Sequence, residues 1–329
     1  MQLVVRADGN AAMGTGHVMR CFALAQAWRD RGGDVTFRSA GLPEPLVKLL
    51  VDEGIALSHV AEAPGSLADV RATAALCAAV TASWLVVDGY HLDTTFEAEG
   101  SVPVLRVDDR PIATSAAYFL NQNLGAKAHA GVRDALLGPQ FALLRREFRR
   151  SAPKMRSANH VTAVVTFGGA DPKGLGQRWL TQAPMLPDVR FLFVIGGANP
   201  RRDALMRAAA SCGNVDVFVA ASDMVPLLDR ADFAISAAGS TLWELAARRV
   251  PAVLIAAAEV EVPSAVAVAN AGAAIYLGKA EEVSDPMMAD AIARLAVDAD
   301  LRCRMVDATS SITDGLGADR TVDRLLGAR

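Results

Sequence analysis

The sequence predicts an α/β protein with two Rossmann-like, doubly wound domains that face each other across a cleft. Short β-branched runs alternate with longer segments of helical periodicity along the chain, which is typical of βαβ units and parallel sheets. A basic, polar stretch with a proline, Arg145–His160, divides the chain into halves of similar size and is typical of a linker. Each half has a glycine-rich turn after its first strand, and such sheets bind ligands at the carboxyl ends of their strands.

The expected strands are near-continuous apolar runs, which is typical of sheets covered on both faces. In the first half they are LVV near Leu3, DVTFR from Asp34, WLVVD from Trp84 and PVLRVDD from Pro103. In the second half they are TAVVTFGG from Thr162, RFLFVIG from Arg190, VDVFV from Val215, FAIS from Phe233 and PAVLIA from Pro251. The segments AQAWRDRG, LADVRATAALCAAV and DALMRAAASCG between them have helical spacing.

This pattern places a first domain over residues 1–150 and a second over residues 151–329. The last segment, from Ala291 onward, has helical periodicity and could pack back across the first domain. A chain of 329 residues is long for one domain and sufficient for two.

The composition narrows the class of protein. With 52% hydrophobic and 21% charged residues, we expect a soluble globular chain with sizeable cores. The net charge of −3, with no strongly basic end, argues against nucleic-acid and anionic-lipid partners. The four cysteines show no C-x-x-C spacing, which argues against a zinc site and a disulfide framework. Neither a secretory signal nor a run long enough to span a bilayer is visible, so we expect a cytoplasmic protein.

The stretch MGTGHVMRC, Met13–Cys21, places a histidine between a glycine-rich turn and the first turn of a helix. The partial positive charge of a helix start disfavours imidazolium, and a neutral imidazole at the mouth of a cleft is a general base. The structural alternative is that the ring of His17 only caps the turn or bonds a carbonyl. Asp8, just after the first strand, could orient this ring or could only cap a loop.

A second polar cluster, VVDGYHLD, follows the strand WLVV, and a third, VDDRP, ends the next strand. Asp88, Tyr90 and Asp93 could hydrogen-bond a polar substrate, because loops at strand ends commonly carry function. The remaining histidines are expected to be surface or loop residues: His59, His91, His129 and His160. The first half lacks H-E-x-x-H and G-x-S-x-G, so metal-assisted hydrolysis and serine-hydrolase chemistry have no support.

Two glycine-rich turns in the second half are candidate phosphate sites. FGGADP, Phe167–Pro172, follows a strand, and SAAGSTLWELA, Ser236–Ala246, leads into a helix. Glycine permits a sharp turn, and a helix start with free N–H groups binds a diphosphate. The alternative is a plain turn with a Ser or Thr N-cap and a Glu favoured by the helix dipole. Neither turn contains G-K-[ST], so neither is a Walker motif.

Taken in order, GTGHVMRC, VDGYHLD, FLNQN with ALLGPQFALLRREF, FGGADP and AGSTLWE resemble the UDP-sugar hydrolase family of the pseudaminic-acid pathway. The resemblance runs from Arg6 to about Pro251. It implies the two-domain glycosyltransferase-B fold and the removal of UDP from UDP-2,4-diacetamido-2,4,6-trideoxy-β-L-altrose. The free sugar would pass to a nonulosonate synthase, a possible pathway partner. Attack of water opposite UDP would invert the anomeric carbon, with no metal or cofactor needed if a helix start neutralises the diphosphate.

The resemblance also implies residue roles. His17 would activate the water, and the first domain would carry the sugar side of the site. The substrate-binding residues there would be Gly14, Gly16, Asp88, Tyr90 and Asp8. The second domain would bind UDP through Gly168 and Gly169, through Gly239, Ser240 and Thr241 at the diphosphate, and through Glu244 at the ribose.

The sequence departs from the family pattern in three places. Val260 and Glu261 stand where the family usually has an asparagine-glutamine pair, Gly89 where a bulky polar residue is common, and Ala238 where a second glycine is common. Two other functions use the same features: a glycosyltransferase with a sugar or lipid acceptor in place of water, and a catalytically silent protein that binds a UDP-sugar.

Overall fold

The computed structural model describes residues 1–10, 13–100, 102–149, 160–221 and 223–327. The chain forms two compact units, the first from Met1–Arg146 with Gly315–Arg329 and the second from Glu147–Asp314. The boundary therefore lies four residues before the predicted one, and the last fifteen residues belong to the first unit. Most of the expected linker, residues 150–159, lies outside the described residues.

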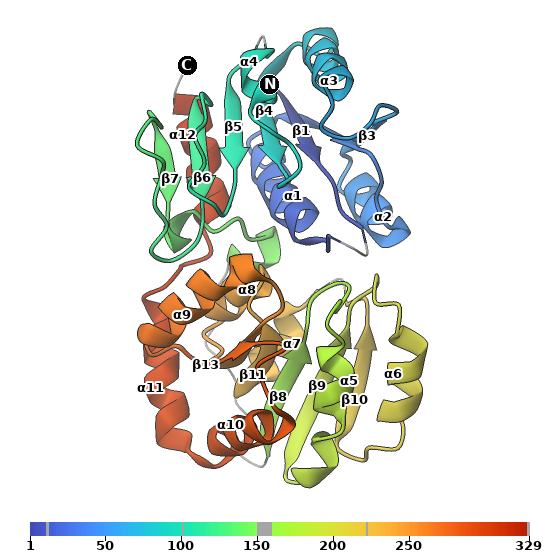
Figure 1. Ribbon diagram of the computed structural model, residues 1–329, viewed down its shortest axis with the longest axis vertical. Coiled ribbons are helices and arrows are strands. Elements are labelled where there is room, and N and C mark those ends of the chain that lie inside the picture. Colours follow the sequence, from blue (N-terminus) through green and yellow to red (C-terminus); the bar gives the residue numbers. More distant parts are fainter. Residues whose placement is uncertain (11–12, 101, 150–159, 222, 328–329) are drawn as a thin grey trace. The chain divides into compact units, whose positions relative to one another are not determined.

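The first unit is built on a parallel sheet with strand order β3-β2-β1-β4-β5-β6-β7 (Figure 1). Its strands are β1 Gln2–Ala7, β2 Asp34–Ser39, β3 Ala56–His59, β4 Ala82–Asp88, β5 Val104–Val107, β6 Tyr118–Asn121 and β7 Ala135–Leu137. Its helices are α1 Gly16–Arg29, α2 Glu44–Asp52, α3 Leu67–Ala79, α4 Thr95–Ala98 and α12 Gly317–Gly327, with a 3₁₀ turn η1 at Pro139–Phe141.

Strand β1 shows why this sheet is covered on both faces. Successive side chains of a strand point to opposite faces. Leu3 and Val5 pack in one core with residues of α1 and α12, whereas Val4 packs in another core with residues of α3 and α4. Both sets are fully buried, which explains why the strand is a continuous apolar run without alternation.

The C-terminal helix α12 completes the first unit. Gly317 lies so close to the backbone of η1 that a Cβ there would be 2.3 Å from the carbonyl oxygen of Ala142 and 2.4 Å from its nitrogen. The buried indole Nε1 of Trp84 donates to the Leu325 carbonyl at 3.0 Å. Val322 and Leu325 pack in the same core as α1, so α12 covers apolar side chains of the first unit.

The second unit has a parallel sheet of order β10-β9-β8-β11-β12-β13 (Figure 1). Its strands are β8 Val161–Thr166, β9 Val189–Ile195, β10 Val215–Val219, β11 Phe233–Ala237, β12 Ala252–Ala256 and β13 Ala274–Lys279. Its helices are α5 Leu175–Leu180, α6 Arg202–Ala209, α7 Val225–Arg230, α8 Thr241–Ala247, α9 Val262–Asn270, α10 Asp285–Val297 and α11 Ala299–Ser310. Short 3₁₀ turns are η2 Arg146–Arg149, η3 Ala183–Met185 and η4 Glu259–Glu261.

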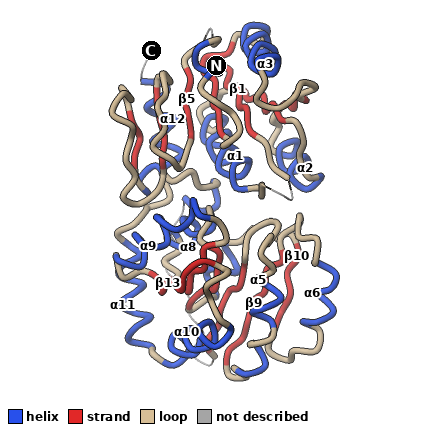
Figure 2. Tube along the Cα trace, viewed as in Figure 1, coloured by secondary structure: helices blue, strands red, loops and turns tan. Residues whose placement is uncertain are grey.

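The structure contains strands at the nine runs expected from the sequence, and Figure 2 shows their alternation with helices. The sequence analysis missed β3, β6, β7 and β13. Strand β3 lies at a sheet edge and is largely exposed, so it carries no apolar run. Strand β7 has three residues, too few for a periodicity. Beyond Ala291 the segment is helical, but only α12 joins the first unit, whereas α10 and α11 stay in the second.

The close approach at Gly317 predicts a stability effect. Gly317→Ala should lower the free energy of unfolding of the chain by about 1–3 kcal/mol, because the new methyl group meets backbone atoms that cannot rotate away. Gly327→Ala is the matched control on the same helix, since a Cβ there meets nothing within 4 Å. Urea unfolding of both variants measures the difference, and equal stabilities would contradict the packing described here.

Candidate functional site

The carboxyl edge of the first sheet gathers polar side chains from neighbouring strands. Ala7 at the end of β1 lies opposite Asp88 at the end of β4, and Asp88 lies opposite Val107 at the end of β5. The residues that follow these strands therefore emerge side by side. This is the edge at which parallel α/β sheets bind ligands.

His17 reaches this edge because the turn from β1 into α1 is tight. Gly14 has a φ of +80°, which favours glycine, and its N–H donates to the Asn10 carbonyl at 2.9 Å. A Cβ on Gly9 would lie 2.8 Å from Val18 Cγ2, so glycine lets the strand end pack on the helix start. Gly16 is the first residue of α1, and His17 the second.

The His17 ring is held by a buried carboxylate. Its Nδ1 lies 2.7 Å from Oδ1 of Asp88, which is fully buried. Arg20, one turn further along α1, approaches Asp88 with Nε at 2.6 Å from Oδ2 and Nη2 at 2.7 Å from Oδ1. Burial by itself would raise the pKa of Asp88, but the Arg20 charge, and then His17 and the hydrogen bonds of both, hold that pKa well below its usual range.

This arrangement determines where the imidazole proton lies. Nδ1 contacts Arg20 Nη2, which is a donor, at 3.2 Å, and the nearer Asp88 Oδ1 at 2.7 Å. An unprotonated Nδ1 would point its lone pair at this carboxylate oxygen, which is repulsive, so Nδ1 carries the proton and donates it to Asp88. The lone pair is then on Nε2, which has no hydrogen-bond partner among the described residues. A neutral imidazole oriented by a carboxylate can accept a proton at Nε2.

Tyr90 packs against this histidine. The two rings meet edge to face with centroids 4.7 Å apart, and the Tyr90 hydroxyl donates to Asp109 Oδ2 at 2.5 Å. Burial and the neighbouring Asp109 charge raise the pKa of Tyr90 well above its usual range, so the phenol stays protonated as a donor. The Arg110 guanidinium lies over the ring, 4.8 Å from its centroid.

The structure adds Arg20, Asp109 and Asn123 to the predicted site residues. Arg20 Nη1 donates to both oxygens of Asp109, at 2.9 and 3.0 Å, and Asn123 Nδ2 donates to Oδ1 at 3.2 Å. Two signals could have found them: Arg20 lies three residues after His17, on the same helix face, and Asp109 belongs to the VDDRP strand end. Asn123 is the last residue of FLNQN and lies two residues after the end of β6.

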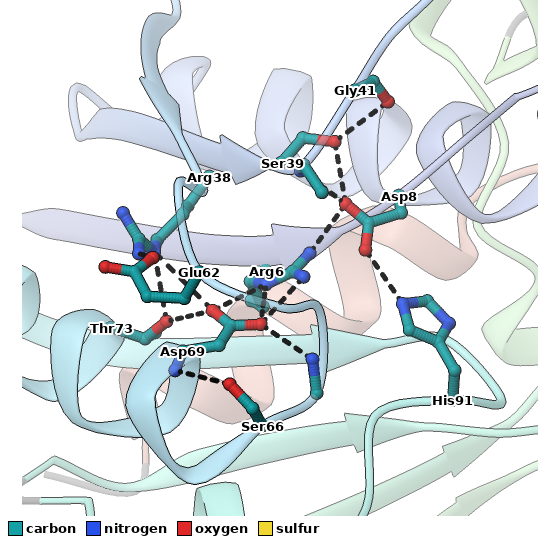
Figure 3. A network of polar contacts seen from close by, with 12 residues as sticks. Arg6, Asp8, Arg38, Ser39, Gly41, Glu62, Ser66, Asp69, Thr73 and His91 are labelled. Carbon is teal, nitrogen blue, oxygen red and sulfur yellow. Dashed lines mark hydrogen bonds and ion pairs between the residues drawn. The ribbon is translucent and has the colours of Figure 1, made fainter.

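Asp8 does not orient His17, and this corrects the first of its two expected roles. Figure 3 shows that it bonds His91, with 2.8 Å between Oδ2 and Nε2. Its Oδ1 accepts from the Ser39 hydroxyl at 2.9 Å and the Ala40 N–H at 2.7 Å, and lies 2.7 Å from Arg6 Nη1. Both oxygens thus already have protein partners, and Asp8 ties the ends of β1, β2 and β4 together.

His91 lies in the exposed loop after β4, as predicted, and its side chain is 30% exposed and paired with Asp8. The pair continues inward through Arg6, whose Nε and Nη2 donate to Asp69 at 2.9–3.2 Å (Figure 3). Burial raises the pKa of Asp8, but the hydrogen bonds of His91 and Arg6 and the Arg6 charge outweigh it and hold the pKa below its usual range.

In the second unit, the FGGADP turn is shaped by close backbone packing. A Cβ on Gly196, after β9, would lie 2.4 Å from the Gly168 carbonyl oxygen and 2.3 Å from that of Gly169. Asp171 accepts the N–H groups of Leu175 and Gly176 at 2.8 and 2.9 Å. The Asp171 carboxylate therefore occupies the start of α5, so this helix start is not open to a phosphate.

The turn before α8 is different, because its donors are open. Ala238 N–H donates to the Ile255 carbonyl at 3.1 Å, but the next three N–H groups, of Gly239, Ser240 and Thr241, have no acceptor among the described residues. Ser240 is the N-cap, and its hydroxyl makes no capping bond. Successive free N–H groups form an anion-binding concavity.

Two carboxylates lie near this turn. Glu244 is in the first turn of α8 and is partly exposed. Glu261 accepts the Ala257 N–H at 2.7 Å through Oε2, and its Oε1 would be 3.1 Å from a Cβ on Gly239. The departure from the family pattern at Glu261 thus borders the turn before α8.

Two searches of the described residues were negative. No group of three or more His, Cys, Asp or Glu side chains is placed to hold a metal ion. Within the same residues, no helix is both long and apolar enough to cross a membrane.

Comparison with curated proteins gives two relatives. The chain is 28% identical over 187 residues to the spore coat polysaccharide biosynthesis protein SpsG of Bacillus subtilis, covering 56% of this chain and 55% of SpsG. It is 20% identical over 284 residues to an uncharacterized protein of Methanocaldococcus jannaschii, covering 78% of this chain and 55% of that one. The chain thus spans about half the length of these relatives. No protein-family model matches.

Solved structures match the whole chain at low identity. MurG of Acinetobacter baumannii has a TM-score of 0.70 at 16% identity, covering 99% of this chain and 100% of MurG. The spinosyn rhamnosyltransferase SpnG has a TM-score of 0.70 at 14% identity, covering 98% and 100%. Staphylococcus aureus MnaA, solved with UDP, has a TM-score of 0.70 at 12% identity, covering 100% and 97%. The predicted fold class is confirmed: two parallel-sheet α/β domains, as in the glycosyltransferase-B structures of MurG and SpnG.

The ion pair of Asp88 predicts a pH-dependent stability. Asp88→Asn should lower the free energy of unfolding by about 3–5 kcal/mol near neutral pH, because it removes the buried carboxylate that faces Arg20. The pKa of Asp88 is depressed in the folded protein, so below about pH 4 the unfolded chain binds a proton that the folded chain does not. The deficit of the variant should therefore be constant above about pH 5 and shrink below about pH 4.

Urea unfolding of both proteins at about pH 7, 5 and 3 measures this deficit. Asp323→Asn is the control, since Asp323 pairs with Arg31 at the surface and is 64% exposed. A deficit for Asp88→Asn that stays the same at acid pH would contradict an ionised Asp88.

Proposed function

We propose that this chain is an enzyme that cleaves a UDP-sugar, with His17 as the general base. The observation that carries the proposal is the His17–Asp88 pair: a buried carboxylate 2.7 Å from Nδ1 that leaves Nε2 as a proton acceptor at the ligand-binding edge of the sheet. A catalytically silent binding protein has no need of a buried ion pair that fixes a histidine tautomer.

The base step follows from the charges of the first unit. A water oxygen attacks the anomeric carbon, and its proton passes to His17 Nε2. The imidazolium that forms is stabilised by Asp88, which Arg20 keeps ionised. The bond from the anomeric carbon to the diphosphate oxygen breaks, and its electron pair leaves with UDP. Attack opposite the leaving group inverts the anomeric configuration.

The leaving group would be bound by the second unit. The open N–H groups of Gly239, Ser240 and Thr241 suit a diphosphate, since they donate without bringing a side-chain charge. Gly168 and Gly169 would line the same nucleotide site, and Glu244 would accept the ribose hydroxyls. MnaA with UDP and SpnG with thymidine diphosphate share this fold, which supports a nucleoside diphosphate as ligand.

For the substrate we propose the sugar that the family resemblance implies, UDP-2,4-diacetamido-2,4,6-trideoxy-β-L-altrose. Tyr90, Gly14, Gly16 and Asp88 would be the sugar side of the site. The product would be the free sugar, a substrate for a nonulosonate synthase. The relation to SpsG, a spore coat polysaccharide biosynthesis protein, supports a sugar pathway in general and does not single out this sugar.

A glycosyltransferase is the second candidate, and the fold matches favour it, since SpnG is a rhamnosyltransferase of the same fold. The same His17 would then take the proton of an acceptor hydroxyl. Proton NMR of the purified chain with candidate UDP-sugars separates the two functions. Free reducing sugar of inverted configuration together with UDP, without an acceptor, supports the hydrolase. Turnover that starts only when an acceptor is added supports the transferase, and no turnover in either case would overturn both.

The sharpest prediction concerns His17. His17→Asn should lower kcat by about 10²–10⁴-fold, the usual contribution of a general base, and should leave UDP affinity unchanged because the second unit binds the nucleotide. His59→Asn, on the exposed edge strand β3, is the control. A His17→Asn chain that folds, binds UDP and turns over at the parental rate would refute the mechanism.

A second prediction concerns the nucleotide. UDP should inhibit competitively, and Glu244→Ala should weaken UDP binding by about 1.5–3 kcal/mol, the scale of a hydrogen bond to a charged group. Glu259→Ala is the control, because Glu259 is 76% exposed and pairs with Lys279. Isothermal titration calorimetry measures both, and an unchanged affinity for Glu244→Ala would remove Glu244 from the site.

A further inference from the structure

The loop after β4 sends two consecutive side chains to opposite neighbours in the sheet. Strand β4 lies between β1 and β5. The Tyr90 hydroxyl reaches Asp109, beyond the end of β5, and the His91 ring reaches Asp8, beyond the end of β1. The backbone between Tyr90 and His91 is therefore held from both sides, by one hydrogen bond in each direction.

The His91 ring takes this position because Gly89 has no side chain. A Cβ on Gly89 would lie 3.0 Å from Cε1 and 3.3 Å from Nδ1 of His91, with Leu92 Cδ1 at 3.2 Å. These separations are tighter than ordinary van der Waals contact. The ring thus fills the space in which a side chain at position 89 would begin, and glycine at 89 and histidine at 91 form one packing unit.

Asp8 is a rigid anchor for that ring. Its carboxylate is buried and is held by the Ser39 hydroxyl, the Ala40 N–H and the Arg6 guanidinium, as Figure 3 shows for Arg6 and Ser39. Arg6 is in turn fixed by Asp69, and both side chains are fully buried. A bond from His91 to this carboxylate therefore ties the loop to the interior of the first unit.

We propose that His91, seated over Gly89 and bonded to Asp8, is a positioning residue that holds Tyr90 edge-on against His17. The inference rests on the proposed function only for its effect on turnover. Tyr90 is 38% exposed, so once His91 is lost its side chain keeps only the hydrogen bond to Asp109, the stacked Arg110 and its contact with His17. Displacement of a side chain next to a reacting group lowers kcat more than it weakens substrate binding.

The experiment uses proton–nitrogen NMR of the histidine rings in the full chain, which has five histidines. His91→Ala and Gly89→Ala should each move the His17 ring resonances, because the Tyr90 ring no longer sits 4.7 Å away in its edge-on position. The double variant should resemble His91→Ala alone, because the Gly89 methyl group has no ring left to displace. His91→Gln should restore the His17 resonances, since its amide can still donate to Asp8. His59→Gln on β3 is the control.

Turnover of the UDP-sugar is the second readout. His91→Ala and Gly89→Ala should each lower kcat by about tenfold or more with KM nearly unchanged, and the two losses should not add. His91→Gln should recover most of the rate. Lower thermal stability with unmoved His17 resonances would overturn the proposal, because His91 would then be structural only. Moved His17 resonances in a chain whose parent cleaves no UDP-sugar would instead overturn the proposed function and leave the positioning role standing.

Discussion

The first unit depends on one buried charge, the carboxylate of Asp88. A fully buried carboxylate is costly unless opposite charge and hydrogen bonds compensate it, and here Arg20 and His17 do so. The same Arg20 then continues to Asp109, which also receives Tyr90 and Asn123. The buried carboxylate of Asp88 therefore positions polar groups from α1, from the ends of β4 and β5 and from the segment after β6. Removing the charge would leave Arg20 under-compensated and the histidine tautomer undetermined.

The two units present their polar groups in different ways. In the first, ionised side chains compensate one another, and the positions of His17 and Tyr90 follow from that balance. In the second, the N–H groups of the turn from Gly239 to Thr241 have no acceptor among the residues that the structure describes, so these donors belong to the backbone of the fold itself. Under the proposed function, the base must change its protonation state during the reaction, whereas the donors to the diphosphate must not, and side chains and backbone suit these two demands respectively.

The fold was readable from the sequence where apolar runs are long. Strands such as β4 and β9 are buried on both faces, so their residues are uniformly apolar and easy to find. Strand β3 is largely exposed and β7 has only three residues, so neither contains a long apolar run. At the site, strand ends identified Asp88 and Tyr90, and a histidine on a glycine turn identified His17. The sequence does not show which carboxylate orients the His17 ring, because Asp8 and Asp88 both lie at strand ends. Only the structure shows that the Asp8 side chain points to His91. The sequence did not predict Arg20 as a site residue, because an arginine on a helix is usually exposed to solvent.

The return of α12 has a consequence for biosynthesis. A ribosome makes chains from the N-terminus, and units commonly fold as they emerge. The second unit, Glu147–Asp314, is fully synthesised before any residue of α12 exists. The α1 core lacks Val322 and Leu325, and Trp84 lacks its carbonyl acceptor, until the residues of α12 leave the exit tunnel. The first unit begins to be made before the second but is completed after it. The nascent first unit therefore exposes the apolar face of α1 throughout the synthesis of the second.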